Sequence, residues 1–384
     1  MAGTARSMLL GEVVRFGNGK SIKPGGEGCY PVYGSNGIIG GSDDFRYENG
    51  VIIGRVGAYC GSVAYCPGRF WASDNTLVAF PATNQFDTKF LFYLLTDANL
   101  SRYAGGAAQP LVTQTVLKQV EVRVPTIVLQ RRIAGMLSAY DDLIENNRRR
   151  IRILEEMARA LYREWFVNFR FPGHEKSKLV TSPFGDIPDD WQVKPIRDFG
   201  NVITGKTPSK ANLGFYGDDL PFVKTPDMHG KIFILGTNER LSRVGAESQA
   251  NKTLPVGSIC VSCIGTIGVV SITTEGCQTN QQINSVVLVS AASREFLFFR
   301  LQDAKQTLEN LGSTGATMGN VNKGKFESVE FICPPDALLV CFHSLVEPMF
   351  SEILSLLHVI QNLRRTRDLL LPRLLSGQIN LKTD

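Results

Sequence analysis

The chain carries a literal match to the phosphate-binding P-loop, Gly200-x4-Gly205-Lys206-Thr207. In that motif a glycine-rich turn opens a long helix whose N-terminus holds the phosphate groups of a nucleotide. Here Pro208 follows directly, and more glycine and proline residues come soon after, so the segment cannot sustain such a helix. We therefore expect no nucleotide site, but a flexible loop that presents Lys206 and Thr207 to a phosphate group of a partner.

Two further patterns suggest chemistry at first sight. Cys260-x-x-Cys263 has the spacing of half a zinc site, but no second pair lies at metal-finger spacing and none of the 4 histidines is close in sequence. We interpret these cysteines as core residues on a strand. Two Asp-x-Lys pairs, at Asp87 and Asp303, resemble a fragment of a nuclease core but have no acidic partner. No Asn-Pro-Pro-aromatic or Phe-x-Gly-x-Gly element for methyl transfer is present, so we expect no catalysis, no metal and no cofactor.

The bulk composition limits the architecture. A length of 384 residues exceeds one ordinary core, which predicts two or more domains. No uninterrupted apolar run approaches the roughly 20 residues of a membrane span, and the first residues resemble no secretion signal, so we expect a cytoplasmic protein without a membrane partner. The 8 scattered cysteines are then reduced and mostly buried. A net charge of +5 permits a nucleic-acid partner without requiring one.

The sequence repeats itself at a period of about 209 residues. In order along the chain, the matched positions are Gly19-Lys20-Ser21 with Gly205-Lys206-Thr207, Gly57 with Gly265, Phe90-Leu91-Phe92 with Phe296-Leu297-Phe298, Val112 with Val321, Pro125 with Pro334, and Leu154 with Leu363. The offset is smaller at the Gly-Lys motif, so the second copy carries about 20 extra residues between that motif and Gly265.

Each copy consists of a glycine-rich part followed by a long helix. Short β-branched and aromatic runs at residues 51–53, 77–80, 258–261 and 286–289 predict a mixed sheet of short strands. Residues 90–100 and 296–308 are expected to form helices on these sheets. The fold class is therefore α/β, with two mixed-sheet domains in tandem, each followed by a long helix.

The long helices share one heptad phase, which is typical of a coiled coil. The first series is Ile133, Tyr140, Asn147, Leu154 and Leu161, repeated as Phe342, Met349, Leu356, Leu363 and Leu370. The companion series is Leu137, Ile144, Ile151, Ala158 and Trp165, repeated as Val346, Ile353, Ile360, Arg367 and Leu374. A helix over residues 128–166 would be roughly 60 Å long at 1.5 Å per residue.

The long helices contain an asparagine in the apolar seam and an internal proline. Asn147 either fixes the register from within the apolar seam or lies at an exposed edge of it. Pro348 should kink the second helix or break it near Glu347. The predicted domains are residues 1–126 and 191–335 for the two sheet modules, 127–171 and 336–384 for the helices, and 172–190 for a linker rich in Pro and Gly.

With these features, the chain resembles the specificity subunit of type I restriction-modification enzymes over essentially its whole length. The resemblance is carried by the two-fold repeat, by Gly185-x-Ile187-Pro188-x-x-Trp191 at the start of the second copy, and by Leu370-Leu-Pro372-Arg-Leu-Leu-Ser-Gly377 near its end. It implies that each module reads one half of a split DNA target, and that the helices pair antiparallel and set the unread spacer. It also implies that the helices dock two methyltransferase subunits, which restriction subunits then join.

Candidate DNA contacts are polar residues on glycine-rich, turn-bearing segments, because backbone there can approach the duplex closely and side chains can reach base edges. They are Lys20, Arg55, Tyr59, Arg69, Asn75 and Gln109 in the first module, and Lys206, Lys210, Lys224, Gln281, Gln282, Asn320 and Lys323 in the second. A solvated surface position is the alternative for each. For the amide-rich run of Gln281 and Gln282 with Asn284, our hypothesis is that some of these amides read bases of an asymmetric target.

Several alternatives stay open. The basic run Arg148-Arg149-Arg150 with Arg152 is either a solvated face or a contact to spacer phosphates or to an acidic partner. The chain as a whole is alternatively a coiled-coil scaffold that binds no DNA, or a nucleotide-binding or nuclease enzyme. The helices also allow the isolated chain to form a homodimer.

Overall fold

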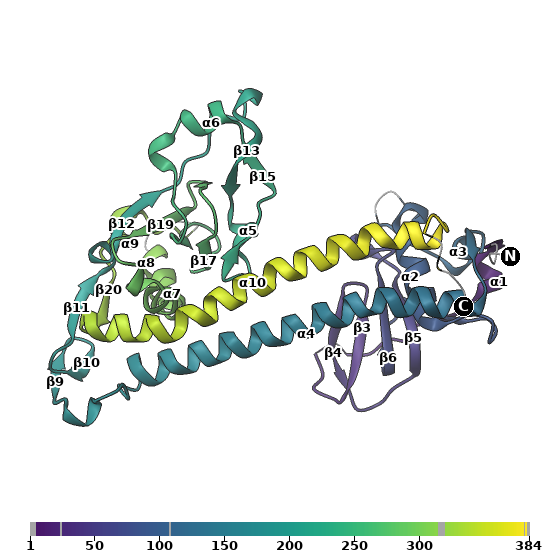
Figure 1. Ribbon diagram of the computed structural model, residues 1–384, viewed down its shortest axis with the longest axis horizontal. Coiled ribbons are helices and arrows are strands. Elements are labelled where there is room, and N and C mark those ends of the chain that lie inside the picture. The colour runs from purple at the N-terminus through teal and green to yellow at the C-terminus, as the bar shows by residue number, and fades with distance from the viewer. Residues whose placement is uncertain (1–4, 24, 107–108, 314–318, 380, 382–384) are drawn as a thin grey trace. The chain divides into compact units, whose positions relative to one another are not determined.

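The computed structural model describes residues 5–23, 25–106, 109–313, 319–379 and 381. They form two compact units, here called unit 1 (Met1–Arg148 with His358–Asp384) and unit 2 (Arg149–Leu357). The two long helices, α4 (Ile127–Phe166) and α10 (Asp336–Leu375), each contribute residues to both units (Figure 1).

Unit 1 is built on a six-stranded mixed sheet. Its order is β2-β7-β5-β6-β3-β4, and only the β3–β6 pair is parallel. The strands are β2 (Val14–Asn18), β3 (Tyr30–Gly34), β4 (Gly37–Ser42), β5 (Tyr47–Gly54), β6 (Val63–Ala72) and β7 (Thr76–Pro81). A separate pair joins β1 (Arg6–Leu9) to β8 (Glu121–Val124), and the helices are α1 (Leu10–Val13), α2 (Thr88–Asp97) and α3 (Gln114–Lys118).

Apolar side chains along the strands of unit 1 point alternately to the two faces of the sheet, and both faces are apolar. On one face, Val51, Ile53 and Ala79 belong to the core that also contains Phe90 and Leu91 of α2. On the other face, Tyr33, Ile52, Phe70 and Val78 form a second cluster. Strand residues with a period of two therefore fill both sides, as expected for a sheet covered on both faces.

Unit 2 repeats this plan with one addition. Its main sheet has the order β12-β19-β16-β17-β14, and a three-stranded sheet has the order β15-β13-β18. The strands are β11 (Gln192–Pro195), β12 (Gly200–Thr204), β13 (Tyr216–Val223), β14 (Phe233–Ile234), β15 (Glu239–Leu241), β16 (Ile259–Ser262), β17 (Val270–Thr273), β18 (Gln278–Thr279), β19 (Ile283–Leu288) and β20 (Glu330–Cys333). The helices are α5 (Thr225–Met228), α6 (Arg243–Glu247), α7 (Arg294–Asp303), α8 (Lys305–Gly312) and α9 (Lys323–Glu327).

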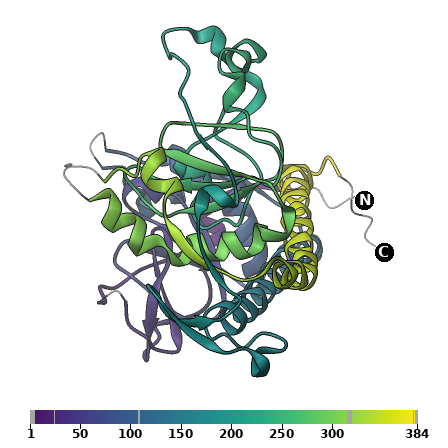
Figure 2. The ribbon, with the colours of Figure 1, turned by 90° about the vertical axis from the view of Figure 1, so that its left-hand side faces the viewer.

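The extra residues of the second copy have a structure of their own. The segment with β13, β15 and α6 projects from the main sheet of unit 2 (Figures 1 and 2). It lies between the Gly205-Lys206-Thr207 motif and Gly265, where the repeat offset predicted an insertion. Gly200 lies in β12, and the described residues 207–212 that follow Lys206 form no helix, so the segment does not have P-loop structure.

The parts of α4 and α10 that belong to unit 1 pack against each other in an antiparallel sense. Ile133 and Leu137 share a core with Leu371 and Leu374. Further along α4, Asp141 pairs with Arg367, so residue numbers rise on one helix as they fall on the other. Asn147 is 7% exposed, which excludes the exposed-edge interpretation.

The parts of the same helices that belong to unit 2 also meet in an antiparallel sense. Arg150 forms a 2.6 Å ion pair with Glu352, and the ring of Trp165 lies 5.8 Å from that of Phe342. Over both units, all ten residues of the first heptad series are buried or half-buried, as are all ten of the companion series. Knobs-into-holes packing along the whole seam stays a prediction.

Helix α10 continues through Pro348, so the helix does not break near Glu347, and the kink that was expected as the other outcome stays a prediction. Pro348 is exposed, which leaves the carbonyl that its missing N–H would have bonded facing solvent. The flanking residues Val346 and Phe350 are fully buried in unit 2 and hold the helix on both sides.

Among the described residues, α10 has the length and apolar composition of a membrane-crossing helix, with a mean hydropathy of 1.5. The expectation drawn from uninterrupted runs missed it because Glu347, Pro348 and Glu352 divide the apolar stretch. Phe342, Val346, Phe350 and Ile353 are fully buried within unit 2, so packing accounts for part of this apolar character, while 28% of the apolar stretch as a whole is buried.

The segment predicted as a linker contains ordered structure. Strands β9 (Leu179–Ser182) and β10 (Gly185–Pro188) form an antiparallel pair. Directly after it, the ring of Trp191 lies 5.9 Å from Phe166 at the end of α4, and 5.2 Å and 5.4 Å from Phe169 and Phe171. The Gly-x-Ile-Pro-x-x-Trp motif therefore anchors the end of α4 within unit 2.

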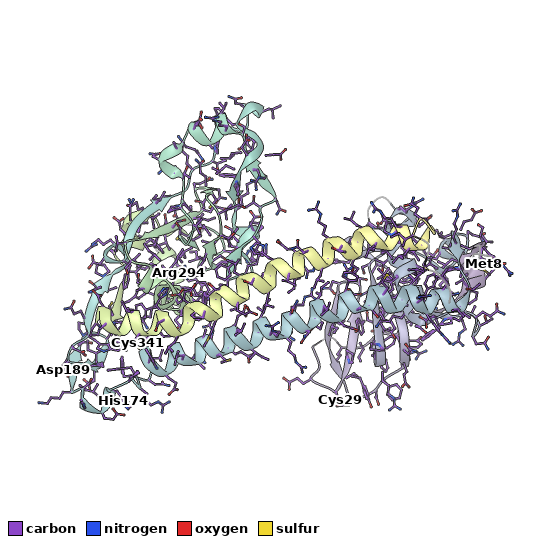
Figure 3. The ribbon with its side chains drawn as sticks, in the orientation of Figure 1. Met8, Cys29, His174, Asp189, Arg294 and Cys341 are labelled. Carbon is purple, nitrogen blue, oxygen red and sulfur yellow. The ribbon has the colours of Figure 1, made fainter. Side chains whose placement is uncertain are left out.

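All 8 cysteines are unpaired. Cys29 and Cys341 are exposed and lie in the β2–β3 connection and on α10 (Figure 3), while the other six are buried. Cys260 lies on β16 in an apolar cluster and Cys263 follows that strand, which agrees with their interpretation as core residues. Burial raises the pKa of Cys260 to about 12 and that of Cys263 to about 11, so both thiols stay protonated at neutral pH.

Candidate nucleic-acid interface

In unit 1, the turn between β6 and β7 (residues 73–75) is held by backbone bonds from three segments. Ser73 donates its N–H to the Tyr33 carbonyl at 2.9 Å, and the Asn75 carbonyl accepts the Arg55 N–H at 2.9 Å and the Ser35 hydroxyl at 2.7 Å. On the third side, Lys20 donates its N–H to the Ala72 carbonyl at 2.9 Å. The turn is therefore fixed by groups that do not depend on the side chains of residues 74 and 75.

Glycine is required beside this turn. A Cβ atom at Gly19 would lie 1.7 Å from the Ser73 carbonyl oxygen, a distance that no side chain tolerates. The Gly-Lys motif thus serves close backbone packing. Its lysine is exposed next to the turn.

In unit 2, the turn between β18 and β19 (residues 280–282) is held by the same bonds. Asn280 donates its N–H to the Val223 carbonyl at 3.1 Å, and Cys263 donates its N–H to the Gln282 carbonyl at 2.7 Å. Lys206 donates its N–H to the Thr279 carbonyl at 2.9 Å. This pattern equates residues 73–75 with residues 280–282.

The shared frame confirms three matches of the repeat. Lys20 and Lys206 make equivalent bonds, as just described. Gly57 and Gly265 both have left-handed backbone, with φ of 77° and 74°. Val112 donates its N–H to the Arg55 carbonyl at 3.0 Å, and Val321 donates its N–H to the Cys263 carbonyl at 2.9 Å. Arg55 and Cys263 are the residues whose own N–H groups hold the two turns.

Most candidate residues of unit 1 gather around the β6–β7 turn. Asn75 is in the turn, Lys20 and Arg55 donate the backbone bonds that flank it, and Tyr59 is 60% exposed at the mouth of a neighbouring cavity. Gln109 precedes Pro110, whose carbonyl accepts the Gly57 N–H. These five residues come from four separate stretches of sequence, which the fold brings together.

Arg69 lies elsewhere on the sheet of unit 1. Its guanidinium is 3.5 Å from Glu48 and 4.5 Å from the centre of the Phe45 ring. A hydrogen bond with Tyr30 and the charge of Glu48 raise its pKa. Because its charge already has a partner, Arg69 is the weakest candidate of this module.

The candidate residues of unit 2 also divide into those around the turn and those that lie further away or have a charged partner. Gln281 and Gln282 are in the β18–β19 turn, Lys206 flanks it, and Asn320 forms a bridge with Ile264 beside it. Lys224 follows Val223 but is paired with Glu239. The exposed residue Lys210 lies further along the loop after Lys206, and Lys323 at the start of α9 lies 3.8 Å from Glu327.

Asn284 does not have the role that the amide-rich run suggested. It is 2% exposed, accepts a 2.6 Å hydrogen bond from Thr204 and donates one of 3.1 Å to the Val321 carbonyl. This amide therefore ties β12 and β19 to the segment before α9. Gln281, by contrast, is exposed and accepts a hydrogen bond from the Thr207 hydroxyl.

Ser73 and Asp74 are not among the residues predicted from sequence. The repeat aligned through its backbone bonds would have revealed them, because it places Asp74 opposite Gln281. Asp74 is exposed, and within the described part of the chain no hydrogen bond or ion pair engages its carboxylate. The Ser73 hydroxyl is buried and has no hydrogen-bond partner among the described residues.

The basic run on α4 is partly neutralised. Arg148 lies 3.4 Å from Glu145 in unit 1, and Arg150 pairs with Glu352 in unit 2. Desolvation and the charges of Arg148 and Arg367 lower the pKa of Arg364 in unit 1, which marks a concentration of positive charge there. A contact of the basic run with spacer phosphates or with an acidic partner stays a prediction.

Known proteins resemble this chain along most of its length. The family profile described as "Type I restriction modification DNA specificity domain" matches residues 6–156 and 188–337. The HindI specificity subunit of Haemophilus influenzae, a type I restriction enzyme subunit, is 33% identical over 372 aligned residues, covering 80% of this chain and 81% of that protein. The MjaIX specificity subunit of Methanocaldococcus jannaschii is 26% identical over 302 residues, covering 77% and 70%.

A solved structure has the same fold. The S subunit of a type I restriction-modification system from M. genitalium has a TM-score of 0.65 to this chain, at 14% identity, and covers 97% of this chain and 96% of its own. This likeness supports the α/β arrangement of two tandem modules with long helices.

Proposed function

Because the chain belongs to the type I restriction-modification DNA specificity family, its role is to recognise DNA sequence, and we propose that its two turns read two different half-sites. The chain is a non-catalytic subunit, and methylation and cleavage reside in the other subunits of such a system. Neither the scaffold nor the enzyme alternative is favoured.

One observation carries the proposal. The same backbone frame holds residues 73–75 and residues 280–282, yet the first turn carries Ser, Asp and Asn while the second carries Asn, Gln and Gln. Side chains at a rigid turn are well suited to base edges, since their donors and acceptors are presented at fixed positions. Different side chains on one frame predict an asymmetric target with two different halves.

The long helices provide the second part of the proposal. We assign to them the spacing between the half-sites and the docking of two methyltransferase subunits, which restriction subunits then join in the cytoplasm. The heptad seam supports this assignment, because its side chains are buried or half-buried within each unit. The apolar residues Leu143, Met157 and Leu345 stay about half exposed on the outer surface of the helices, where a partner can cover them.

Methylation mapping tests the proposal. The chain is co-expressed with the methyltransferase subunit of its own system, and methylated adenines are located in the host DNA by single-molecule sequencing. We expect one split motif with two different halves and a constant gap. Replacing Gln281 with Ala should relax one half alone. Absence of any motif that depends on this chain, with an active methyltransferase present, would refute the proposed function.

A further inference from the structure

A cavity of about 470 Å³ lies beside the β6–β7 turn of unit 1. Three segments that the backbone bonds described above hold together form most of its walls: the turn itself, the tight turn after β3 with Ser35 and Asn36, and residues 56–59 with Tyr59. Ile22 and Ile39 complete the lining. The cavity is open to solvent on the side of Tyr59 and Asp74, which are exposed. It is therefore a preformed recess at the place where five candidate contacts gather.

Two polar groups at this cavity have no partner among the described residues. The Ser73 hydroxyl is buried, with only 4% of the residue exposed, and a buried hydroxyl without a hydrogen bond costs free energy. The Asp74 carboxylate, at the rim, has neither a hydrogen bond nor a cation within the described residues. A carboxylate only accepts hydrogen bonds, so a ligand here must donate.

The hydrogen-bonding groups of the four DNA bases restrict which base this carboxylate can bind. In the major groove guanine presents two acceptors, and thymine presents an acceptor and a methyl group, so both would face the carboxylate unfavourably. Adenine presents a donor, but its N7 acceptor lies beside that donor. Cytosine presents its N4 amino group with no neighbouring acceptor of its own, which makes it the natural partner of an aspartate.

We propose that this cavity receives the major-groove edge of one cytosine in the half-site read by unit 1, and that Asp74 accepts a hydrogen bond from its N4 amino group. The inference rests on the proposed function and adds the identity of one base. Asp74 is thereby a specificity-determining residue. In unit 2, the equivalent residue Gln281 accepts a hydrogen bond from Thr207 and carries an amide in place of a carboxylate. The base recognised at this position of unit 2 should therefore differ.

The test uses the assembled complex with its methyltransferase subunits. Asp74→Asn keeps the shape of the side chain and adds a donor. The motif of the wild-type complex should contain a C·G pair in one half, and Asp74→Asn should relax that position alone. Gln281→Ala serves as the matched control, because it should relax the other half and thereby assign the halves to the units.

Binding to synthetic duplexes gives the magnitude. Discrimination between the C·G pair and the other three pairs should fall in Asp74→Asn by on the order of 10- to 100-fold. The wild-type complex should lose affinity by a similar factor when that cytosine is replaced by 2-pyrimidinone, which lacks the amino group, whereas Asp74→Ala should be insensitive to this replacement. Binding of the variants to non-cognate DNA should be unchanged or tighter, because a negative charge has been removed near phosphates.

The possible failures are distinguishable. If the wild-type motif is split but the half assigned to unit 1 has no C·G pair, or if Asp74→Asn leaves every position unchanged, the inference is overturned and the proposed function stands. A uniform loss of binding to all sequences would equally overturn it, since it would assign Asp74 a structural role. If the wild-type complex yields no motif, the proposed function itself fails.

Discussion

Replacing Asp141 with alanine should destabilise unit 1, because this carboxylate serves two partners at once. It accepts a 2.5 Å hydrogen bond from the Tyr93 hydroxyl of α2 and pairs with Arg367 of α10. Tyr93 is only 2% exposed, and its burial, together with the hydrogen bond to Asp141, raises its pKa. Asp141 thus joins the sheet module to both long helices.

The magnitude follows from burial. A hydrogen bond to a charged group contributes about 1.5–3 kcal/mol, and an unpaired charge in a fully buried site costs about 3–5 kcal/mol. The Asp141 and Arg367 side chains are 29% and 27% exposed, and Arg367 keeps a second partner in Asp368, so the upper value does not apply. We expect a loss of about 2–3 kcal/mol for Asp141→Ala and about 1.5 kcal/mol for Tyr93→Phe, the lower end of the range because this hydrogen bond is only partly buried.

Urea unfolding followed by circular dichroism measures these changes, with the slope of free energy against urea checked for constancy. Glu352→Ala is the control, because its pair with Arg150 is about half exposed and should contribute at most about 1 kcal/mol. If Asp141→Ala destabilises the protein no more than Glu352→Ala does, the argument from burial is refuted.

Three further substitutions test other parts of the structure. Gly19→Ala should displace Ser73 and abolish recognition of one half-site, while Gly68→Ala, where a Cβ meets nothing within 4 Å, should leave the methylation motif intact. Pro348→Ala should raise the free energy of unfolding by about 1–3 kcal/mol in urea unfolding, since it restores a helix hydrogen bond; a loss of stability would contradict the solvent-facing account. Burial raises the pKa of Glu155, so folding favours its protonated form, and its charge destabilises unit 2 as the pH rises through the ordinary carboxyl pKa and the raised pKa of the folded state. Glu155→Gln should therefore raise the thermal unfolding temperature at pH 7 and leave it unchanged well below the ordinary carboxyl pKa. Equal effects at both pH values would contradict this account.

The repeat and the helices were predictable from sequence because they depend on patterns that extend over many residues. A heptad phase and a set of ordered matches predicted the long helices and the equivalence of Gly57 with Gly265, and the structure agrees with both. Of the two outcomes predicted for Pro348, a kink or a break, the break does not occur, because the flanking residues of the helix are fully buried. Tertiary packing outweighed the local preference.

The candidate contacts were less predictable because sequence does not show which polar groups already have partners. Asn284 looked like a base reader until its two hydrogen bonds were seen, and Lys224 is paired with a glutamate from a neighbouring strand. Asp74 was overlooked for the opposite reason. Its significance comes from an unpartnered carboxylate beside a cavity, which no spacing rule indicates.

The way in which the two turns are held has a consequence for how new specificities arise. Most mutations destabilise a protein, which limits how many can accumulate before it fails to fold. Residues 74 and 281 stand outside the backbone bonds that fix their turns, so exchanging them should leave the folded state intact. Such positions can be altered repeatedly at little cost in stability. A restriction system can therefore change the DNA sequence that it recognises while the fold of its specificity subunit stays the same.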